Sequence, residues 1–265
     1  NHEYEVTEQN VQYIRSQLED AIHVLEKLTG RPFDYEKLGR VMEISSQTAK
    51  MWKKASMMAR SKPSPLNGFD LFNYMAVIVC MRGRQEGLEL FTLWCQELEE
   101  KQKKGLGPWK DQEEEIRILW DGIACWPYLS GTYKTLKKYG INMVTSTYPD
   151  SWTILYEKGD LDGMARAYSS NYVNRNLDYG VDNLARLVEE FSLDGIIFHS
   201  NRSCKFMDFR QYEVQRRVTE RTGVASVMFD GDQTDPSAFS MAQFETRIQS
   251  LVEMVQEKRR GGSEA

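Results

Sequence analysis

The chain has 265 residues, with 34 Lys and Arg against 39 Asp and Glu and a net charge of -5 at pH 7. This length allows one large domain or two of ordinary size, with a sizeable core. The balanced charge lacks the basic patch that marks nucleic-acid binding, and no apolar run approaches the roughly 20 residues that span a bilayer. We therefore expect neither nucleic acid nor a membrane among its partners.

The four cysteines lie far apart in the sequence, at positions 80, 95, 125 and 204, and none belongs to a C-x-x-C pair. This density is too low for the disulfide framework of a secreted domain, which favours a reducing, cytoplasmic location. The sequence begins Asn-His-Glu-Tyr, which has no Met and lacks the charged-then-apolar layout of a signal peptide. We expect the chain to be part of a longer polypeptide.

Residues 1–112 are predicted to form a helical segment. Gly30 is predicted to end its first helix, Asp34 to cap the second, and the Pro-rich stretch 61–65 to separate the second from the third. Apolar residues recur at helical spacing in four stretches, which are residues 11–25, 38–52, 71–79 and 88–98.

Two sets of residues in or near this segment are given structural roles. Cys80 and Cys95 each have apolar helical neighbours, so both are interpreted as small core residues and not as metal ligands. The charged runs at residues 101–104 and 113–115 are interpreted as solvated faces.

Residues 113–260 are predicted to form a parallel α/β domain, followed by a disordered tail at residues 261–265. Right-handed crossovers between its strands give a doubly wound sheet, for which we predict the flavodoxin-like strand order 2-1-3-4. Apolar β-type runs alternate here with amphipathic helices, and the expected strands are residues 116–124, 141–144, 195–198 and 225–229.

Two local features of this domain are predicted as well. Asp208 with Gln211, and Ser240 with Gln243, are interpreted as the capping pairs of two helices. The connection at residues 148–176 is unusually long and rich in aromatic residues. We expect such a connection either to take part in function or to carry short helices of its own.

A cysteine that follows the third strand is the strongest candidate for chemistry. Residues 196–198 are typical of a strand buried on both faces, and the polarity then changes at once to HSNRSCK at residues 199–205. Open α/β sheets bind ligands beyond the carboxyl ends of their strands, and the cations Arg202 and Lys205 favour the thiolate of Cys204. The residues alone leave two alternatives, a reactive or metal-binding thiol and an ordinary loop cysteine.

Other candidate groups at the strand ends are few. The predicted strand order brings Cys125 toward Cys204. A zinc site needs three or four ligands, so His199 and Cys204 together are too few. Asp230 and Asp232 follow the fourth strand, where they either act as metal ligand or base or shape the loop. The sequence contains no nucleophile elbow, phosphate-binding loop or dinucleotide fingerprint.

Spaced motifs occur in a fixed order along the chain. They are DLF and RG at the two ends of residues 70–83, RILWDGI at 117–123, WP at 126–127, HSNRSCK at 199–205, QRRVTE at 215–220 and DQTDP at 232–236. Together they resemble one family, the subunits of 2-hydroxyacyl-CoA dehydratases and benzoyl-CoA reductases. The resemblance covers essentially the whole chain.

This resemblance implies an oxygen-sensitive enzyme of anaerobic bacteria, built as a heterodimer with a [4Fe-4S] cluster in each subunit. It implies that a separate ATP-hydrolysing iron–sulfur activator protein supplies one electron, and that the acyl-CoA thioester loses its hydroxyl through a ketyl radical to give an enoyl-CoA. Cys204 matches a cluster ligand of the family. The other two usual ligands belong to an N-terminal domain that this sequence lacks, so the chain resembles interdomain helices plus a C-terminal domain and is expected to be inactive alone.

The main interpretation is a lyase subunit that removes water from an (R)-2-hydroxyacyl-CoA. Three alternatives stay open, which are a subunit of an ATP-dependent benzoyl-CoA reductase, a non-catalytic partner subunit, and a flavodoxin-like binding module. We also expect an apolar face to be exposed where the missing domain would pack. The candidate contacts to the acyl-CoA substrate lie at strand ends and are Trp126, Ser146, Ser200, Asn201 and Arg202.

Overall fold

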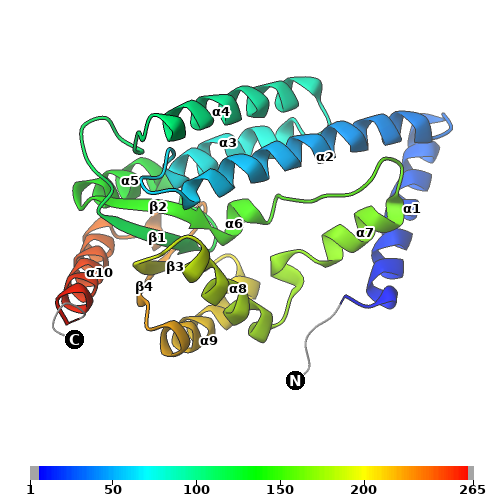
Figure 1. Ribbon diagram of the computed structural model, residues 1–265. Helices are drawn as coiled ribbons and strands as arrows, with labels where there is room; N and C mark the ends of the chain where they lie inside the picture. The colour runs from blue at the N-terminus through cyan, green and yellow to red at the C-terminus, as the bar shows by residue number, and fades with distance from the viewer. Residues whose placement is uncertain (1–5, 262–265) are drawn as a thin grey trace.

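The structure is a computed structural model that describes residues 6–261. It contains a four-stranded parallel sheet with helices on both faces and a helical segment beside one edge (Figure 1). The strand order is β2-β1-β3-β4, which confirms the prediction. The strands are β1 (Ile116–Asp121), β2 (Ile141–Ser146), β3 (Gly195–Asn201) and β4 (Ala225–Gly231).

The first three strands are buried at every position, as expected for a parallel sheet covered on both faces, whereas the edge strand β4 is only partly buried. The first strand is shorter than predicted, because it ends at Asp121 and not at residue 124. Gly122 takes a φ of 101°, a conformation that favours glycine, and this turns the chain out of the sheet.

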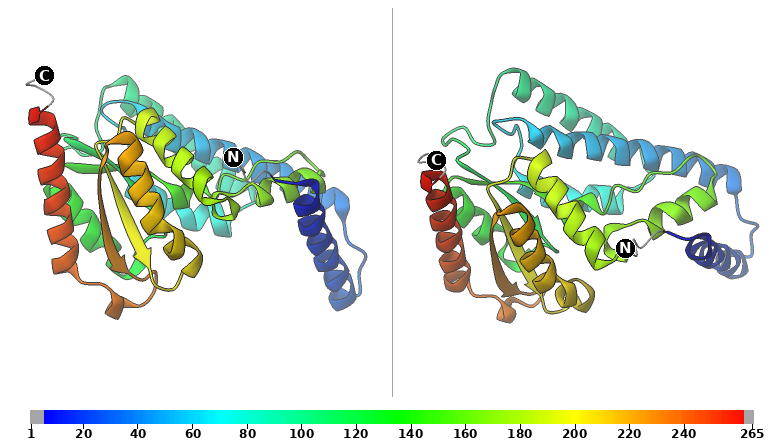
Figure 2. Two further views of the ribbon diagram at one scale, coloured as in Figure 1. Left: turned by 90° about the horizontal axis from the view of Figure 1, so that it is seen from below. Right: turned by 60° about the horizontal axis from the view of Figure 1, so that its bottom comes forward.

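Helices α5 and α10 cover one face of the sheet, and α8 and α9 cover the other (Figures 1 and 2). The chain thus adds β2 on one side of β1 and then β3 and β4 on the other side, so the strand order reverses between β1 and β3. Such a reversal is where doubly wound sheets form their ligand crevice. These helices are α5 (Leu129–Lys138), α8 (Leu177–Glu190), α9 (Lys205–Thr222) and α10 (Met241–Gly261).

The first part of the chain is helical, as predicted. Gly30 ends the first helix with a φ of 65°, and the Asp34 side chain caps the second by accepting a hydrogen bond of 2.7 Å from the backbone N–H of Lys37. Helix α1 projects away from the sheet and packs against α7, whereas α3 packs against β2 (Figures 1 and 2). The helices are α1 (Glu8–Thr29), α2 (Tyr35–Met57), α3 (Gly68–Cys80) and α4 (Gln85–Lys103).

One continuous apolar core joins this helical segment to the sheet. Trp52 of α2, Phe72 of α3 and Trp120 of β1 all belong to it. Cys95 is buried within the same core, as predicted. The prediction for Cys80 is wrong, because this residue is exposed at the end of α3. The buried positions of that helix follow another face, so apolar neighbours in sequence did not place Cys80 in the core.

The acidic run at residues 113–115 is not a solvated face throughout. The side chain of Glu114 is buried and forms an ion pair with the buried Arg117 of β1. Its second carboxylate oxygen accepts a hydrogen bond of 2.5 Å from Asn142 of β2. Arg117 also donates to the backbone oxygen of Ala59, at 2.6 Å. This polar network ties the end of the helical segment to two strands of the sheet.

The two predicted capping pairs have different outcomes. Ser240 accepts a hydrogen bond of 3.4 Å from the backbone N–H of Gln243, which confirms it as a cap. Asp208 and Gln211 do not cap α9, because that helix already begins at Lys205. Helix α10 includes Gly261, and the rest of the predicted tail, residues 262–265, lies outside the described residues.

The long connection after β2 carries short helices of its own, as one prediction stated. It is fixed to the helical segment by several hydrogen bonds and ion pairs, two of which join side chains of that segment to backbone oxygens near the start of the connection. The indole of Trp52 donates to the oxygen of Pro149 at 3.0 Å, and the guanidinium of Arg82 donates to the oxygen of Trp152 at 2.6 Å. The short helices are α6 (Thr147–Asp150), α7 (Leu161–Ser169) and η3 (Tyr172–Asn174), and the others in the chain are η1 (Met58–Arg60), η2 (Trp126–Tyr128) and η4 (Pro236–Ala238).

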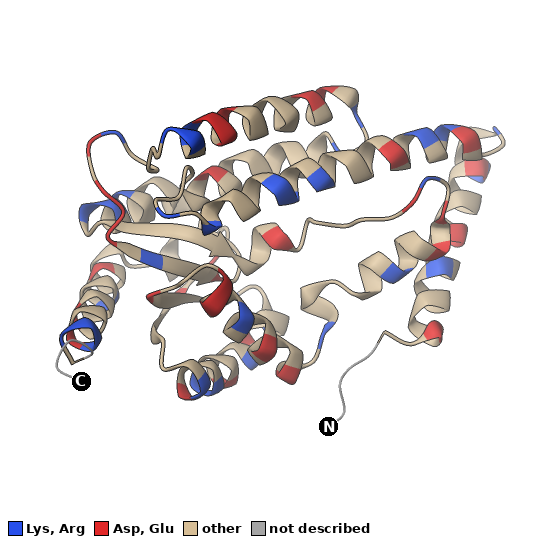
Figure 3. Cartoon of the chain, viewed as in Figure 1, with Lys and Arg blue, Asp and Glu red and all other residues tan. Residues whose placement is uncertain are grey.

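Acidic and basic residues alternate along most helices, and neither sign gathers over one large region of the view in Figure 3. Among the described residues, no helix combines the length and the apolar character required to cross a membrane.

Candidate functional site

Cys204 lies at the carboxyl end of the sheet, between β3 and α9. Its backbone N–H donates to the oxygen of Asn201 at 2.9 Å, and its own oxygen accepts from the N–H of Asp208 at 3.1 Å. The thiol is free and the residue is partly exposed. The turn after β3 and the first turn of α9 therefore hold one accessible sulfur at the rim of the sheet, as the sequence predicted.

The loop after β4 supports this turn through Asp232. The hydroxyl of Ser203 donates to one carboxylate oxygen of Asp232. The other oxygen accepts from the backbone N–H groups of Thr234 and Asp235, at 2.8 and 2.9 Å. These bonds, that from Ser203 foremost, hold the pKa of the Asp232 carboxyl well below its ordinary value. Of the two alternatives for Asp232, the contacts support loop formation, and Asp230 is exposed.

Cys125 is joined to the same loop but is not accessible. Its thiol donates to the backbone oxygen of Asp232 at 3.2 Å, and the residue is only 1% exposed. Burial raises the pKa of this thiol. The strand order thus brings Cys125 and Cys204 to the same loop, as predicted, but Cys125 stays a buried, protonated hydrogen-bond donor.

Three of the predicted substrate contacts already make hydrogen bonds within the protein. Ser146 caps α6 by accepting from the N–H of Tyr148 at 3.4 Å. Ser200 donates to the carboxylate of Asp208 at 2.8 Å. The side-chain oxygen of Asn201 accepts from the N–H of Ser203 at 3.3 Å. These residues shape the rim, and their contact with a substrate stays a prediction.

Trp126 and Arg202 are the more accessible members of the predicted set. Trp126 is 37% exposed, and its ring lies 5.9 Å from that of Phe72 in an edge-to-face arrangement. Arg202 is exposed, and its backbone N–H donates to the oxygen of Gly231 at 3.1 Å. Over residues 6–261, its guanidinium has no hydrogen-bond or ion-pair partner. It is therefore available to an anionic ligand.

Asp121 is a candidate site residue that the sequence analysis did not single out. It ends β1 at the point where the strand order reverses, and it is only 1% exposed. Its carboxylate accepts hydrogen bonds of 2.8 Å from the hydroxyl of Thr147 and from the amide of Gln211. The hydroxyl of Tyr172 lies 3.4 Å away. The one sequence feature that could have indicated this residue is a predicted strand that ends in Asp-Gly. That feature is weak on its own, because the hydrogen-bond partners of Asp121 come from distant segments of the chain.

The long connection also carries Tyr148, whose side chain is partly buried. Burial raises the pKa of the Tyr148 hydroxyl, and charge on the Cys204 sulfur raises it further. The ring of Trp152 lies 6.3 Å from that of Tyr148. The aromatic character of this connection, noted in the sequence, therefore includes a partly buried, protonated phenol.

His199 is buried inside the sheet and does not reach a ligand site. Its Nδ1 bonds to the backbone oxygen of Ile123 at 2.6 Å, which assigns the proton to that nitrogen. The ring stacks on Phe229 with centroids 4.8 Å apart, and Nε2 has no partner within the described structure. Burial lowers the pKa of the imidazole. His199 is therefore a neutral residue that anchors the loop after β1.

The residues present fit an iron–sulfur group only in part. Thiolates are the usual protein ligands of such clusters, and Cys204 offers one accessible sulfur. Within residues 6–261, no group of three or more His, Cys, Asp or Glu side chains is arranged to hold a metal ion. The described residues therefore do not supply a complete ligand set for a cluster at Cys204.

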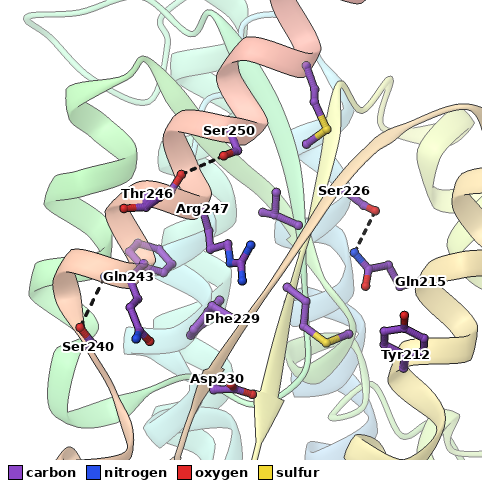
Figure 4. Close-up of a pocket in the computed structure, with 14 residues that line it drawn as sticks. Tyr212, Gln215, Ser226, Phe229, Asp230, Ser240, Gln243, Thr246, Arg247 and Ser250 are labelled. Atoms are coloured by element: carbon purple, nitrogen blue, oxygen red, sulfur yellow. Dashed lines mark hydrogen bonds between the residues drawn. The ribbon is translucent and has the colours of Figure 1, made fainter.

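A groove of about 870 Å³ runs along the free edge of β4, between α9 and α10 (Figure 4). Tyr212 and Gln215 of α9, Asp230 of β4 and Arg247 of α10 are among the residues that line it. None of the predicted substrate contacts lines it, and neither does Cys204. Of the candidates that the sequence placed at the strand ends, Asp230 does line the groove.

Comparisons with known proteins identify the family. Residues 2–255 match the model of the family described as 2-hydroxyglutaryl-CoA dehydratase, D-component. The (R)-2-hydroxyisocaproyl-CoA dehydratase alpha subunit of Clostridioides difficile is 50% identical over 265 residues, which is 98% of this chain and 64% of the relative. The (R)-phenyllactyl-CoA dehydratase alpha subunit of Clostridium sporogenes is 40% identical over 259 residues, with 98% and 63% covered.

A more distant relative is a benzoyl-CoA reductase subunit of Thauera aromatica, 26% identical over 260 residues, which is 92% of this chain and 60% of the relative. The chain thus spans less than two thirds of the length of each of these proteins. The resemblance that the sequence motifs indicated is confirmed. The chain belongs to the 2-hydroxyglutaryl-CoA dehydratase D-component family.

Proposed function

We propose that this chain is part of one subunit of a 2-hydroxyacyl-CoA dehydratase, which removes water from an (R)-2-hydroxyacyl-CoA to give an enoyl-CoA. The observation that carries this proposal is the difference in identity between two kinds of relative. The chain is 40–50% identical to four dehydratase alpha subunits and 26% identical to a benzoyl-CoA reductase subunit. This favours dehydration over ring reduction.

The same proposal includes partners. The relatives are named alpha subunits, which supports a second subunit in the active enzyme. We further propose an ATP-hydrolysing iron–sulfur activator protein as the electron donor, as the family resemblance implies. The acyl-CoA would approach the carboxyl end of the sheet, where the unpaired guanidinium of Arg202 and the partly exposed ring of Trp126 are available for contact.

For the cofactor, we propose that Cys204 supplies one ligand to a [4Fe-4S] cluster whose other ligands come from outside residues 6–261. When bound, such a cluster supplies single-electron chemistry. Asn201 and Asp232 hold the turn that carries the sulfur, and the start of α9 places backbone N–H groups beside an anionic centre. The buried Cys125 is not part of this ligand set.

The reaction is tested in an anaerobic assay with the full-length subunit, its partner subunit, the activator, ATP and a reductant. We expect elimination of water from at least one 2-hydroxyacyl-CoA and no reduction of benzoyl-CoA. Reduction of benzoyl-CoA without turnover of any 2-hydroxyacyl-CoA would contradict the proposal. The absorption spectrum of the purified protein distinguishes the enzyme from a flavodoxin-like binding module. The module would show structured flavin bands, whereas the enzyme would show broad iron–sulfur absorption.

A further inference from the structure

The first turns of α9 expose three aromatic side chains. Phe206 is 54% exposed, Phe209 is 87% exposed and Tyr212 is 73% exposed. Their spacing of three residues places them along one side of the helix, and the residues on the other side, Met207 and Val214, are buried against the protein. We call these three residues the aromatic stripe. Exposed apolar side chains that gather on one side of a helix mark an interaction surface more often than side chains scattered singly.

The neighbouring charges cover the stripe only in part. The guanidinium of Arg210 lies 4.4 Å from the ring of Tyr172 and 5.6 Å from that of Phe206, and it donates to the oxygen of Arg175. The carboxylate of Asp208 accepts from Ser200. The first turns of α9 therefore present exposed aromatic rings, with Lys205 and Asp208 as exposed charged neighbours. Such a surface suits a permanent, apolar contact.

The position of the stripe limits what can cover it. It begins two residues after Cys204, on the helix that this cysteine precedes. Within the described part of the chain, no group of three or more His, Cys, Asp or Glu side chains is arranged to hold a metal ion, so the described residues do not complete a ligand set around that sulfur. Any segment that completes a cluster at Cys204 must approach within a few ångströms of it, and it must therefore pass beside the first turn of α9.

The length of the relatives indicates where such a segment comes from. This chain covers 64% of the dehydratase alpha subunit of Clostridioides difficile and 63% of that of Clostridium sporogenes. The unmatched third of each relative is long enough to form a domain.

We propose that the aromatic stripe is the docking surface for the part of the same polypeptide that corresponds to this unmatched third. The proposal rests on the proposed function, because the need for further ligands at Cys204 is its main argument. The partner subunit and a second copy of this chain are the competing occupants. The stripe is an interdomain contact in this account, and its three residues take no direct part in the reaction.

Hydroxyl-radical footprinting of the full-length subunit tests this proposal. The subunit is prepared without iron, and oxidation of Phe209 and Tyr212 is measured by mass spectrometry against the urea-unfolded subunit, with and without the partner subunit. In the absence of the partner subunit, we expect both residues to be oxidised about tenfold more slowly than in the urea-unfolded subunit, because the centre of an interface excludes water. Phe209→Ser should then raise the oxidation of Tyr212 several-fold, whereas Leu93→Ser, at a 65% exposed site on α4, should not.

Three outcomes would overturn the proposal. Protection that appears only after the partner subunit is added would assign the stripe to the subunit interface. Rapid oxidation in both samples would show that nothing covers the stripe. Protection that is lost on dilution of the subunit alone would assign it to a second copy. Because the samples contain no iron, the result is independent of whether Cys204 is a cluster ligand.

Discussion

The hydroxyl of Ser203 donates a hydrogen bond to the carboxylate of Asp232, and the next residue in the chain is Cys204. The carboxylate is fixed in turn by the backbone N–H groups of Thr234 and Asp235. The position of the candidate ligand after β3 therefore depends on the loop after β4. This dependence can be tested without changing the cysteine.

Asp232→Ala removes the buried acceptor of these partly buried bonds and leaves the donors of Ser203, Thr234 and Asp235 without their protein partner, which is costly. We expect a lower urea midpoint and a lower iron content in the full-length subunit. Asp230→Ala is the matched control, because this aspartate lies two residues earlier and is exposed. Equal iron content and equal midpoints for the two variants would contradict the role given to Asp232.

The buried His199 makes stability depend on pH. Burial lowers the pKa of its imidazole below the ordinary value of 6.5, so the unfolded chain binds more protons than the folded chain as the pH falls. This contribution to stability is complete above about pH 6.5 and is lost progressively below it. His199→Gln keeps a donor for Ile123 and removes the titration. The fall in urea midpoint between about pH 7.5 and about pH 5.5 should be smaller in the variant, and an equal fall would contradict this account.

The two cysteines of the helical segment should respond differently to serine. Cys95 is buried, and its thiol donates to the oxygen of Met51 at 3.2 Å. A hydroxyl can keep that bond, so we expect Cys95→Ser to lower the free energy of unfolding by about 1 kcal/mol. Cys80 is exposed, so Cys80→Ser should change it by less than about 0.5 kcal/mol. Denaturant unfolding measures both values, and a larger loss for Cys80→Ser would be inconsistent with the structure.

The buried pair of Glu114 and Arg117 gives a stronger stability effect. Glu114→Ala leaves the guanidinium of Arg117 buried without its anion and removes the acceptor of Asn142. Breaking such a pair from one side costs about 3–5 kcal/mol. The neighbouring Glu113 is exposed, so Glu113→Ala is the control and should be close to neutral. Similar unfolding midpoints for the two variants would show that the pair is not required.

Local rules predicted the strands and several helix ends, and the general topology of doubly wound sheets supplied the strand order. The glycine at position 30 and the aspartate at position 34 act within a few residues of the helix ends that they define, and the burial of β3 follows from its composition. These features depend on contacts between near neighbours in sequence or on a single pattern. The sequence alone contains enough information to predict features of these two kinds.

The errors concern side chains whose partners lie far away in sequence. Glu114 appeared to be one of three solvated acids, yet its partner Asn142 belongs to another strand. Gln211 appeared to cap a helix, but its amide donates to Asp121, a separation of 90 residues. Whether a polar residue is a cap, a network member or a site residue depends on tertiary contacts. Helical spacing and capping patterns do not contain that information.

The central claim is that Cys204 is a cluster ligand, and iron and sulfide analysis of anaerobically purified, full-length Cys204→Ser tests it most directly. Serine keeps the size of the side chain but removes the soft sulfur ligand. We predict a large loss of iron and sulfide together with loss of dehydratase activity, while Cys80→Ser, an exposed cysteine of the same chain, keeps both. A full complement of iron and normal turnover in Cys204→Ser would contradict the claim.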